Sequence, residues 1–146
     1  MDIFKKILTS VTSLFLALLF TVIPMKDGAL ELQLNAPVTQ SSTEIILTYV
    51  NNSGRSVVFC EDDYFAERKT ETGWVAEPRL NRETVREIAT VIRPQGAHQY
   101  TLTLTEPLDA GEYRITQTYS MEGFSLRLPF AETESTHKTT VEFTVS

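Results

Sequence analysis

The feature that most limits the fold of this 146-residue chain is a recurring pattern of short segments in which apolar and polar residues alternate. Leu30–Leu34 reads LELQL, which places three leucines on one side of an extended strand and polar residues on the other. Comparable segments follow about every ten residues, and no long amphipathic helix lies between them. The pattern predicts an antiparallel sandwich or barrel rather than alternating βαβ units.

Roughly eight short strands are expected. Residues 43–50 and 56–60 are separated by NNSG at 51–54, which predicts either a hairpin or a corner. The run at 56–60 is apolar enough for a strand buried on both sides, whereas Pro78 and dense charge favour a loop over 77–88. The remaining expected strands are 30–34, a hairpin over 64–76, 89–92, 98–105, 112–119, 124–130 and 138–145.

Residues 1–28 differ from the rest of the chain. Lys5 and Lys6 precede an uncharged, strongly apolar run over 7–25, and Pro24 stands near its end. This layout is typical of a hydrophobic N-terminal helix that acts either as a secretory signal peptide or as a membrane anchor. Both interpretations put the Lys pair in the cytoplasm and residues 29–146, the expected folded domain, outside it.

Charge and cysteine content limit the partners and the covalent chemistry. From residue 30 onward the chain has 10 Lys and Arg against 17 Asp and Glu, a net charge of −7. An acidic domain repels phosphate backbones, so nucleic acid is not an expected partner. Cys60 is the single cysteine, so an internal disulfide is impossible. Its place at the end of an apolar run favours a small buried side chain on a strand, and pairing with another chain is the alternative.

The most informative motif is LDAGEY at 108–113, which has the Leu-x-x-Gly-x-Tyr pattern of a tyrosine corner. Gly111 allows a tight turn, Leu108 is expected to be buried under it, and the Tyr113 hydroxyl is expected to bond to a backbone group upstream. An ordinary hairpin turn is the alternative.

The order of several motifs resembles that of bacterial immunoglobulin-like domains of exported Gram-positive proteins. The shared features are NNSG at 51–54, Tyr64 with the Gly73-Trp74 pair, IRPQG at 92–96 and LDAGEYRI at 108–115. The resemblance covers about residues 30–146. It implies an all-β, immunoglobulin-like antiparallel β-sandwich of about seven to nine strands with no shared catalytic residues. A fainter resemblance to small bacterial proteinase-inhibitor domains implies an inhibitory loop, for which 77–87 and 132–137 are the candidates.

No catalytic, cofactor or metal site is expected. His98 and His137 are the only histidines, and no Gly-x-Ser-x-Gly segment is present. The acidic run of Glu61, Asp62 and Asp63 lacks the glycine and the distal glutamate of a calcium loop, so a solvated turn is expected there.

The expected function is that of a non-catalytic binding or accessory module at the bacterial cell surface, with a protein as partner and contact with the membrane only through the N-terminal segment. Tyr64, Phe65 and Trp74 form a candidate binding surface, because aromatic side chains beside a polar rim are typical of interfaces. The alternative for Tyr64 and Trp74 is packing in the core.

Overall fold

The computed structural model describes residues 28–82, 84–122 and 136–146. These residues form nine β-strands, which confirms the all-β prediction and the range of seven to nine strands. The strands are β1 (Leu30–Leu34), β2 (Glu44–Asn51), β3 (Val57–Cys60), β4 (Tyr64–Thr70), β5 (Gly73–Ala76), β6 (Ala89–Ile92), β7 (Ala97–Thr103), β8 (Gly111–Met121) and β9 (His137–Val145).

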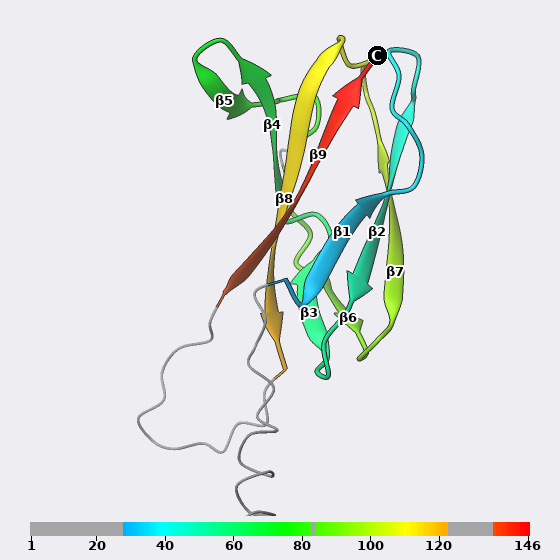
Figure 1. Ribbon diagram of the computed structural model, residues 1–146, viewed down its shortest axis with the longest axis vertical. Helices are drawn as coiled ribbons and strands as arrows, with labels where there is room; N and C mark the ends of the chain where they lie inside the picture. The colour runs from blue at the N-terminus through cyan, green and yellow to red at the C-terminus, as the bar shows by residue number, and fades with distance from the viewer. Residues whose placement is uncertain (1–27, 83, 123–135) are drawn as a thin grey trace, which may run out of the picture.

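The strands form two sheets that face each other (Figure 1). One sheet has three strands in the order β1-β2-β7. The other has six: β5-β4-β8-β3-β6, with β9 paired to the remaining edge of β8. All strand pairs among the described residues are antiparallel, and one isolated parallel bridge joins Val38 to Val145, the last residue of β9.

Alternation along the strands places the core between the two sheets. In β2 every second residue from Ile45 to Asn51 is buried, and in β8 the same holds from Tyr113 to Tyr119. Large rings meet across the interior, with Tyr49 and Phe59 at 4.5 Å between ring centroids. Burying such side chains stabilises the sandwich by roughly 1.5–3 kcal/mol each, which suits a fold in which no disulfide forms within the chain.

Strands β3 and β4 lie end to end along the same edge of β8. Val58 pairs with Ser120 and Tyr64 pairs with Gln117, so the chain advances six residues on one side and three on the other. The three additional residues are Glu61, Asp62 and Asp63. Extra residues on one strand of a pair form a β-bulge, which interrupts the ladder of backbone hydrogen bonds. We call these three residues the acidic bulge.

The structure decides one alternative that the sequence left open and revises one expectation, and two further expectations lie outside the described residues. The segment at 51–56 is a corner, since β2 and β3 belong to different sheets. The strand at 57–60 is buried on one side only, with Val57 and Phe59 inside and Val58 and Cys60 half-exposed, because β3 faces the second sheet with one side alone. The N-terminal helix and the strand expected at 124–130 fall outside the described residues. Within the described ranges, no helix is long and apolar enough to cross a membrane.

Candidate functional site

The segment before β8 has the geometry of a tyrosine corner. The Tyr113 hydroxyl donates a hydrogen bond of 2.8 Å to the carbonyl oxygen of Asp109, four residues upstream. Leu108 is fully buried beneath the turn and Gly111 is the first residue of β8. On the solvent side, the Arg68 and Arg79 guanidinium groups both reach the Asp109 carboxylate, at 3.4 and 3.1 Å. These contacts fix the corner, and they give it a structural role.

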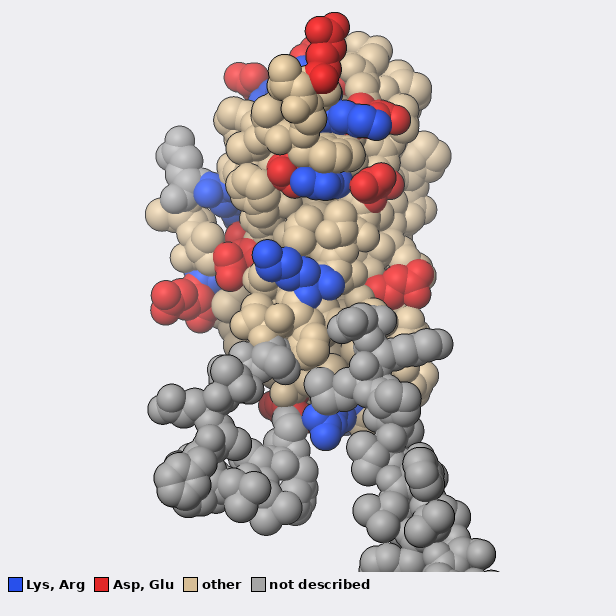
Figure 2. All heavy atoms as spheres, turned by 60° about the vertical axis from the view of Figure 1, so that its left-hand side comes forward, with Lys and Arg blue, Asp and Glu red and all other residues tan. Residues whose placement is uncertain are grey.

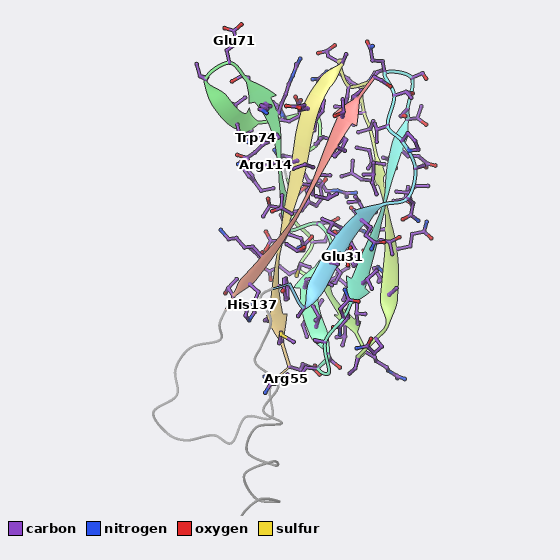
Figure 3. All side chains as sticks on the ribbon, in the orientation of Figure 1. Glu31, Arg55, Glu71, Trp74, Arg114 and His137 are labelled. Carbon is purple, nitrogen blue, oxygen red and sulfur yellow. The ribbon has the colours of Figure 1, made fainter. Side chains whose placement is uncertain are left out.

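The three aromatic side chains of the candidate binding surface lie on two different faces of the sheet. Tyr64 points inward, and its hydroxyl donates to the Leu80 carbonyl oxygen at 2.6 Å. Phe65 points outward with 51% of its surface exposed. Trp74 on β5 is half-buried on the outer side, where the Arg114 guanidinium lies 4.4 Å from its ring centroid (Figure 3). The structure therefore brings Phe65 and Trp74 to one face and removes Tyr64 from it.

The outer face of β4, β8 and β9 carries a shallow hollow of about 440 Å³. Phe65 lies in its lining, and the hydroxyl groups of Thr116 and Thr118 come from β8. On the same face, oppositely charged side chains pair across β4 and β8: Arg114 with Glu67 at 2.5 Å in the lining of the hollow, and Lys69 with Glu112 at 2.8 Å. Figure 2 shows acidic and basic side chains alternating over this side of the molecule. The other residues that line the hollow are Asp63, Tyr64, Glu67, Arg114 and Lys138.

The acidic bulge is not a solvated turn, contrary to the sequence-based expectation. Asp62 is buried, and its carboxylate accepts hydrogen bonds from Tyr100 at 2.9 Å and Arg86 at 3.0 Å, with Arg82 at 3.4 Å. Burial alone would raise the pKa of Asp62, but the hydrogen bonds from Arg86 and Tyr100 outweigh it and hold the pKa below its ordinary value. The bulge turns its middle residue, Asp62, toward Tyr100 on β7. Of its three residues, only Asp63 is exposed.

The Gln117 side chain supplies hydrogen bonds at the point where the bulge interrupts the backbone ladder. Its side-chain amide donates to the carbonyl oxygens of Cys60 and Asp63, both at 2.9 Å, and its own oxygen accepts the Tyr49 hydroxyl at 3.1 Å. Gln117 is fully buried. Sequence reasoning missed this residue, although a signal was present: Gln117 is the one polar residue at the inward positions of β8 between Tyr113 and Tyr119.

His98 lies beside a carboxylate and an aromatic ring. Its Nε2 atom contacts Glu61 of the bulge, and its ring meets that of Phe59 edge-on at 6.4 Å. Cys60 lies on β3 as expected but is half-exposed rather than buried, because its side chain points to the outer side of the sheet. His137 stacks on Tyr119 at 5.3 Å. In the described part of the chain, no three His, Cys, Asp or Glu side chains gather in a way that could hold a metal ion.

The first part of the 77–88 segment is anchored to the sandwich. Glu77 is buried and accepts hydrogen bonds from Arg79 at 2.7 and 3.0 Å, which hold the pKa of its carboxyl below the ordinary value although burial opposes the shift. The Asn81 side chain bonds to the backbone of Ala66 as a neighbouring strand would. Its oxygen accepts from the Ala66 amide at 2.8 Å, and its nitrogen donates to the Ala66 carbonyl oxygen at 2.9 Å. Beyond this anchor, Val85 and Ile88 are exposed.

Two facing antiparallel sheets, a corner between β2 and β3, and a tyrosine hydroxyl bonded back to the turn before β8 define an immunoglobulin-like β-sandwich. Comparison of the sequence with protein families agrees, since the model described as "Bacterial Ig-like domain" matches residues 27–144. The chain belongs to the bacterial Ig-like domain family. No curated protein matches the sequence significantly.

Several solved structures are similar in outline. An X-ray structure of the Northeast Structural Genomics Consortium target SoR45 is 13% identical, with a TM-score of 0.46 over 82% of this chain and 89% of that one. The archaellum periplasmic stator protein FlaG from Sulfolobus acidocaldarius is 11% identical, with a TM-score of 0.43 over 78% and 99%. A PapD-like domain of human CEP192 is 15% identical, with a TM-score of 0.36 over 85% and 89%.

Proposed function

We propose that this protein is a non-catalytic, exported binding or accessory module that acts at the bacterial cell surface through contacts with another protein. The observation that carries the proposal is the contrast between its ionisable and its apolar groups. The described acidic groups inside the fold are already paired: Asp62 with two arginines and Glu77 with Arg79. An aromatic side chain, Phe65, is instead exposed beside a hollow on a regular sheet face.

The hollow is the proposed binding surface. Its lining combines the exposed aromatic ring of Phe65 with charged side chains, including Asp63 and Lys138, and protein interfaces often have this composition. The sheet beneath it is rigid, because β8 pairs on both sides. A preformed surface of this kind binds with little loss of conformational freedom.

The export part of the proposal rests on the sequence of residues 1–28 and on the bacterial family. Cys60 offers a direct test, because it is the only thiol and is half-exposed. Intact cells that express the full chain should incorporate a membrane-impermeant maleimide, and the Cys60→Ser variant should not. Labelling that appears only after cell lysis would contradict export.

The binding surface is tested by photo-crosslinking in living cells. A photoreactive amino acid at position 65 of the full chain should give a discrete adduct with a protein. The same amino acid at Thr101, which is exposed on β7 of the opposite sheet, is the matched control and should not give that adduct. Equal adducts at both positions, or none at position 65, would remove the hollow from the proposal.

A small secreted proteinase inhibitor is the second candidate. The observation in its favour is that Val85 and Ile88 project from a segment whose start is held by Glu77, Leu80 and Asn81. Rigid support of an exposed loop is what a substrate-like inhibitor requires. Residues 132–135 of the other candidate loop lie outside the described residues. Inhibition of any protease in a panel by the full chain, with loss of inhibition in the Val85→Asp variant, would favour this function over the first.

A further inference from the structure

Within the described parts of the chain, the outer edge of β6 has backbone groups that no other strand pairs with. β6 is the last strand of the six-stranded sheet, and among the described residues it pairs only with β3. An edge strand of this kind presents N–H and C=O groups to which another strand can be added.

The register of β3 shows which residues point to that edge. The Glu122 amide donates to the Ser56 carbonyl oxygen at 2.9 Å, so even-numbered residues of β3 bond to β8 and odd-numbered ones bond to β6. Val57 pairs with Ile92, and Phe59 pairs with Thr90. The amides and carbonyls of Ala89 and Val91, which alternate with these, therefore point to the free edge.

The side chains around the edge are apolar in the middle and charged at the ends. Val91 is 52% exposed and Ile88 is 63% exposed, the largest value among the exposed large apolar side chains of the described residues. Glu87 precedes the strand and Arg93 follows it, and both are exposed. Neither side chain has an ion-pair partner among the described residues.

We propose that β6 pairs with β6 of a second copy of this chain, antiparallel and around a twofold axis at Thr90. The two edges exchange hydrogen bonds where residues with free backbone groups lie opposite each other, and placing Ala89 opposite Val91 of the second copy uses both residues of each strand. That register brings Ile88 next to Ile92 of the second copy. It also brings Glu87 at one end close to Arg93 at the end of the other strand.

Charge complementarity is the reason to name a second copy as the occupant. The strand carries an acid before it and a base after it, so an antiparallel copy matches both ends at once. The backbone also allows registers that place Ala89 opposite Ala89 or Val91 opposite Val91, and the pairing of Glu87 with Arg93 selects the register centred on Thr90. The contact joins two six-stranded sheets and covers the exposed Val91 and Ile88. Because β6 has only four residues, the interface is small and the dimer is weak.

Charge exchange tests the register. Sedimentation equilibrium of the full chain in detergent should show dimers whose Kd rises about 10- to 100-fold in the Glu87→Arg variant and in the Arg93→Glu variant, because each creates two repulsive pairs. A mixture of the two variants should form a heterodimer at least as tight as the wild-type dimer, since every pair is then attractive. The double variant E87R/R93E should also dimerise. A mixture no tighter than the separate variants, or a wild-type chain that stays monomeric at millimolar concentration, would overturn the proposal.

Disulfide trapping tests the axis. Residues opposite each other at a non-hydrogen-bonded antiparallel position lie about 4.5 Å apart at Cα, within disulfide range. Thr90→Cys in a Cys60→Ser background should therefore crosslink to itself under mild oxidation. Val75→Cys on β5, at the opposite end of the sheet and 44% exposed, is the matched control. Crosslinking that is equally fast at position 75 would show random collision and would overturn the assignment of β6.

Discussion

The acidic bulge and the outer face of β4 and β8 contain similar ion pairs in very different surroundings. Asp62 meets Arg86 at 3.0 Å, with 4% of the Asp62 side chain and 67% of the Arg86 side chain exposed. Lys69 meets Glu112 at a shorter distance, 2.8 Å, with 53% and 54% of the two side chains exposed. Water screens the second pair and competes for it, whereas the first pair replaces the water that Asp62 has lost. The distance between the charged groups therefore does not tell which pair contributes more to stability. The burial of the carboxylate does.

The largest effect should follow Asp62→Ala. The change leaves the buried Tyr100 hydroxyl and two arginines without their acceptor, and we expect the free energy of unfolding to fall by about 3 kcal/mol. Urea denaturation of the full chain measures the loss. Asp63→Ala is the matched control, because the neighbouring carboxylate is exposed. Equal losses in the two variants would remove the distinction between the buried and the exposed carboxylate.

Acid should reproduce part of that loss. The pKa values of Asp62 and Glu77 in the folded protein lie below their ordinary values. The unfolded chain therefore binds more protons, and stability rises with pH in this range. The contribution is complete above the ordinary carboxyl pKa of about 4 and is lost as the pH falls through the lowered values. Denaturation midpoints between pH 6 and pH 2.5 should fall more steeply for the wild type than for Asp62→Asn, and parallel curves would contradict the assignment.

A smaller loss is expected for Gln117→Leu, which keeps the volume and removes the amide. The carbonyl oxygens of Cys60 and Asp63 and the Tyr49 hydroxyl then lose a partner inside the protein, and we expect a cost of about 2 kcal/mol. Thr116→Val, on the outer side of the same strand, is the control. If the leucine variant were as stable as the wild type, the bulge would not depend on this side chain.

Tyr113→Phe should cost about 1 kcal/mol, the usual contribution of one hydrogen bond whose donor is removed while its ring stays packed. Thermal unfolding followed by circular dichroism is sufficient to detect it. Tyr119→Phe is a useful comparison, because the Tyr119 hydroxyl only accepts a long contact of 3.4 Å from the Leu30 amide. A larger loss at position 119 than at 113 would argue against a special role of the corner.

The smallest effect should follow Lys69→Met on the outer face. Its pKa is raised by the hydrogen bond to Glu112, yet about half of the Lys69 side chain is exposed to solvent. We expect a midpoint within the error of measurement at 0.15 M salt, with a slight difference only at low ionic strength. A salt-independent loss comparable to that of Tyr113→Phe would show that exposed ion pairs on the outer face contribute to stability as much as a buried hydrogen bond does.

Much of the fold follows from the sequence because alternation is a local property. The inward residues of β2, β7 and β8 could be predicted, as could the corner around Leu108 and Tyr113, since each rests on short spacings. The bulge could not, because its acidic residues look solvated until Arg82, Arg86 and Tyr100 are brought to it from later in the chain. Phe65 and Trp74 were expected at a surface together with Tyr64. The partner of the Tyr64 hydroxyl, the Leu80 carbonyl, lies in a segment with no strand pattern.

The bulge also constrains how this chain can change length during evolution. Its three residues are an odd number, and successive side chains of a strand point to opposite faces. Val57 and Phe59 therefore point inward before the bulge, and Tyr64 and Ala66 point inward after it. A change of one residue that shifted β4 against β8 would turn Phe65 and Glu67 toward the core and expose Tyr64. Relatives that differ in length here should therefore take up the difference within residues 61–63 and keep the register of β4 on β8.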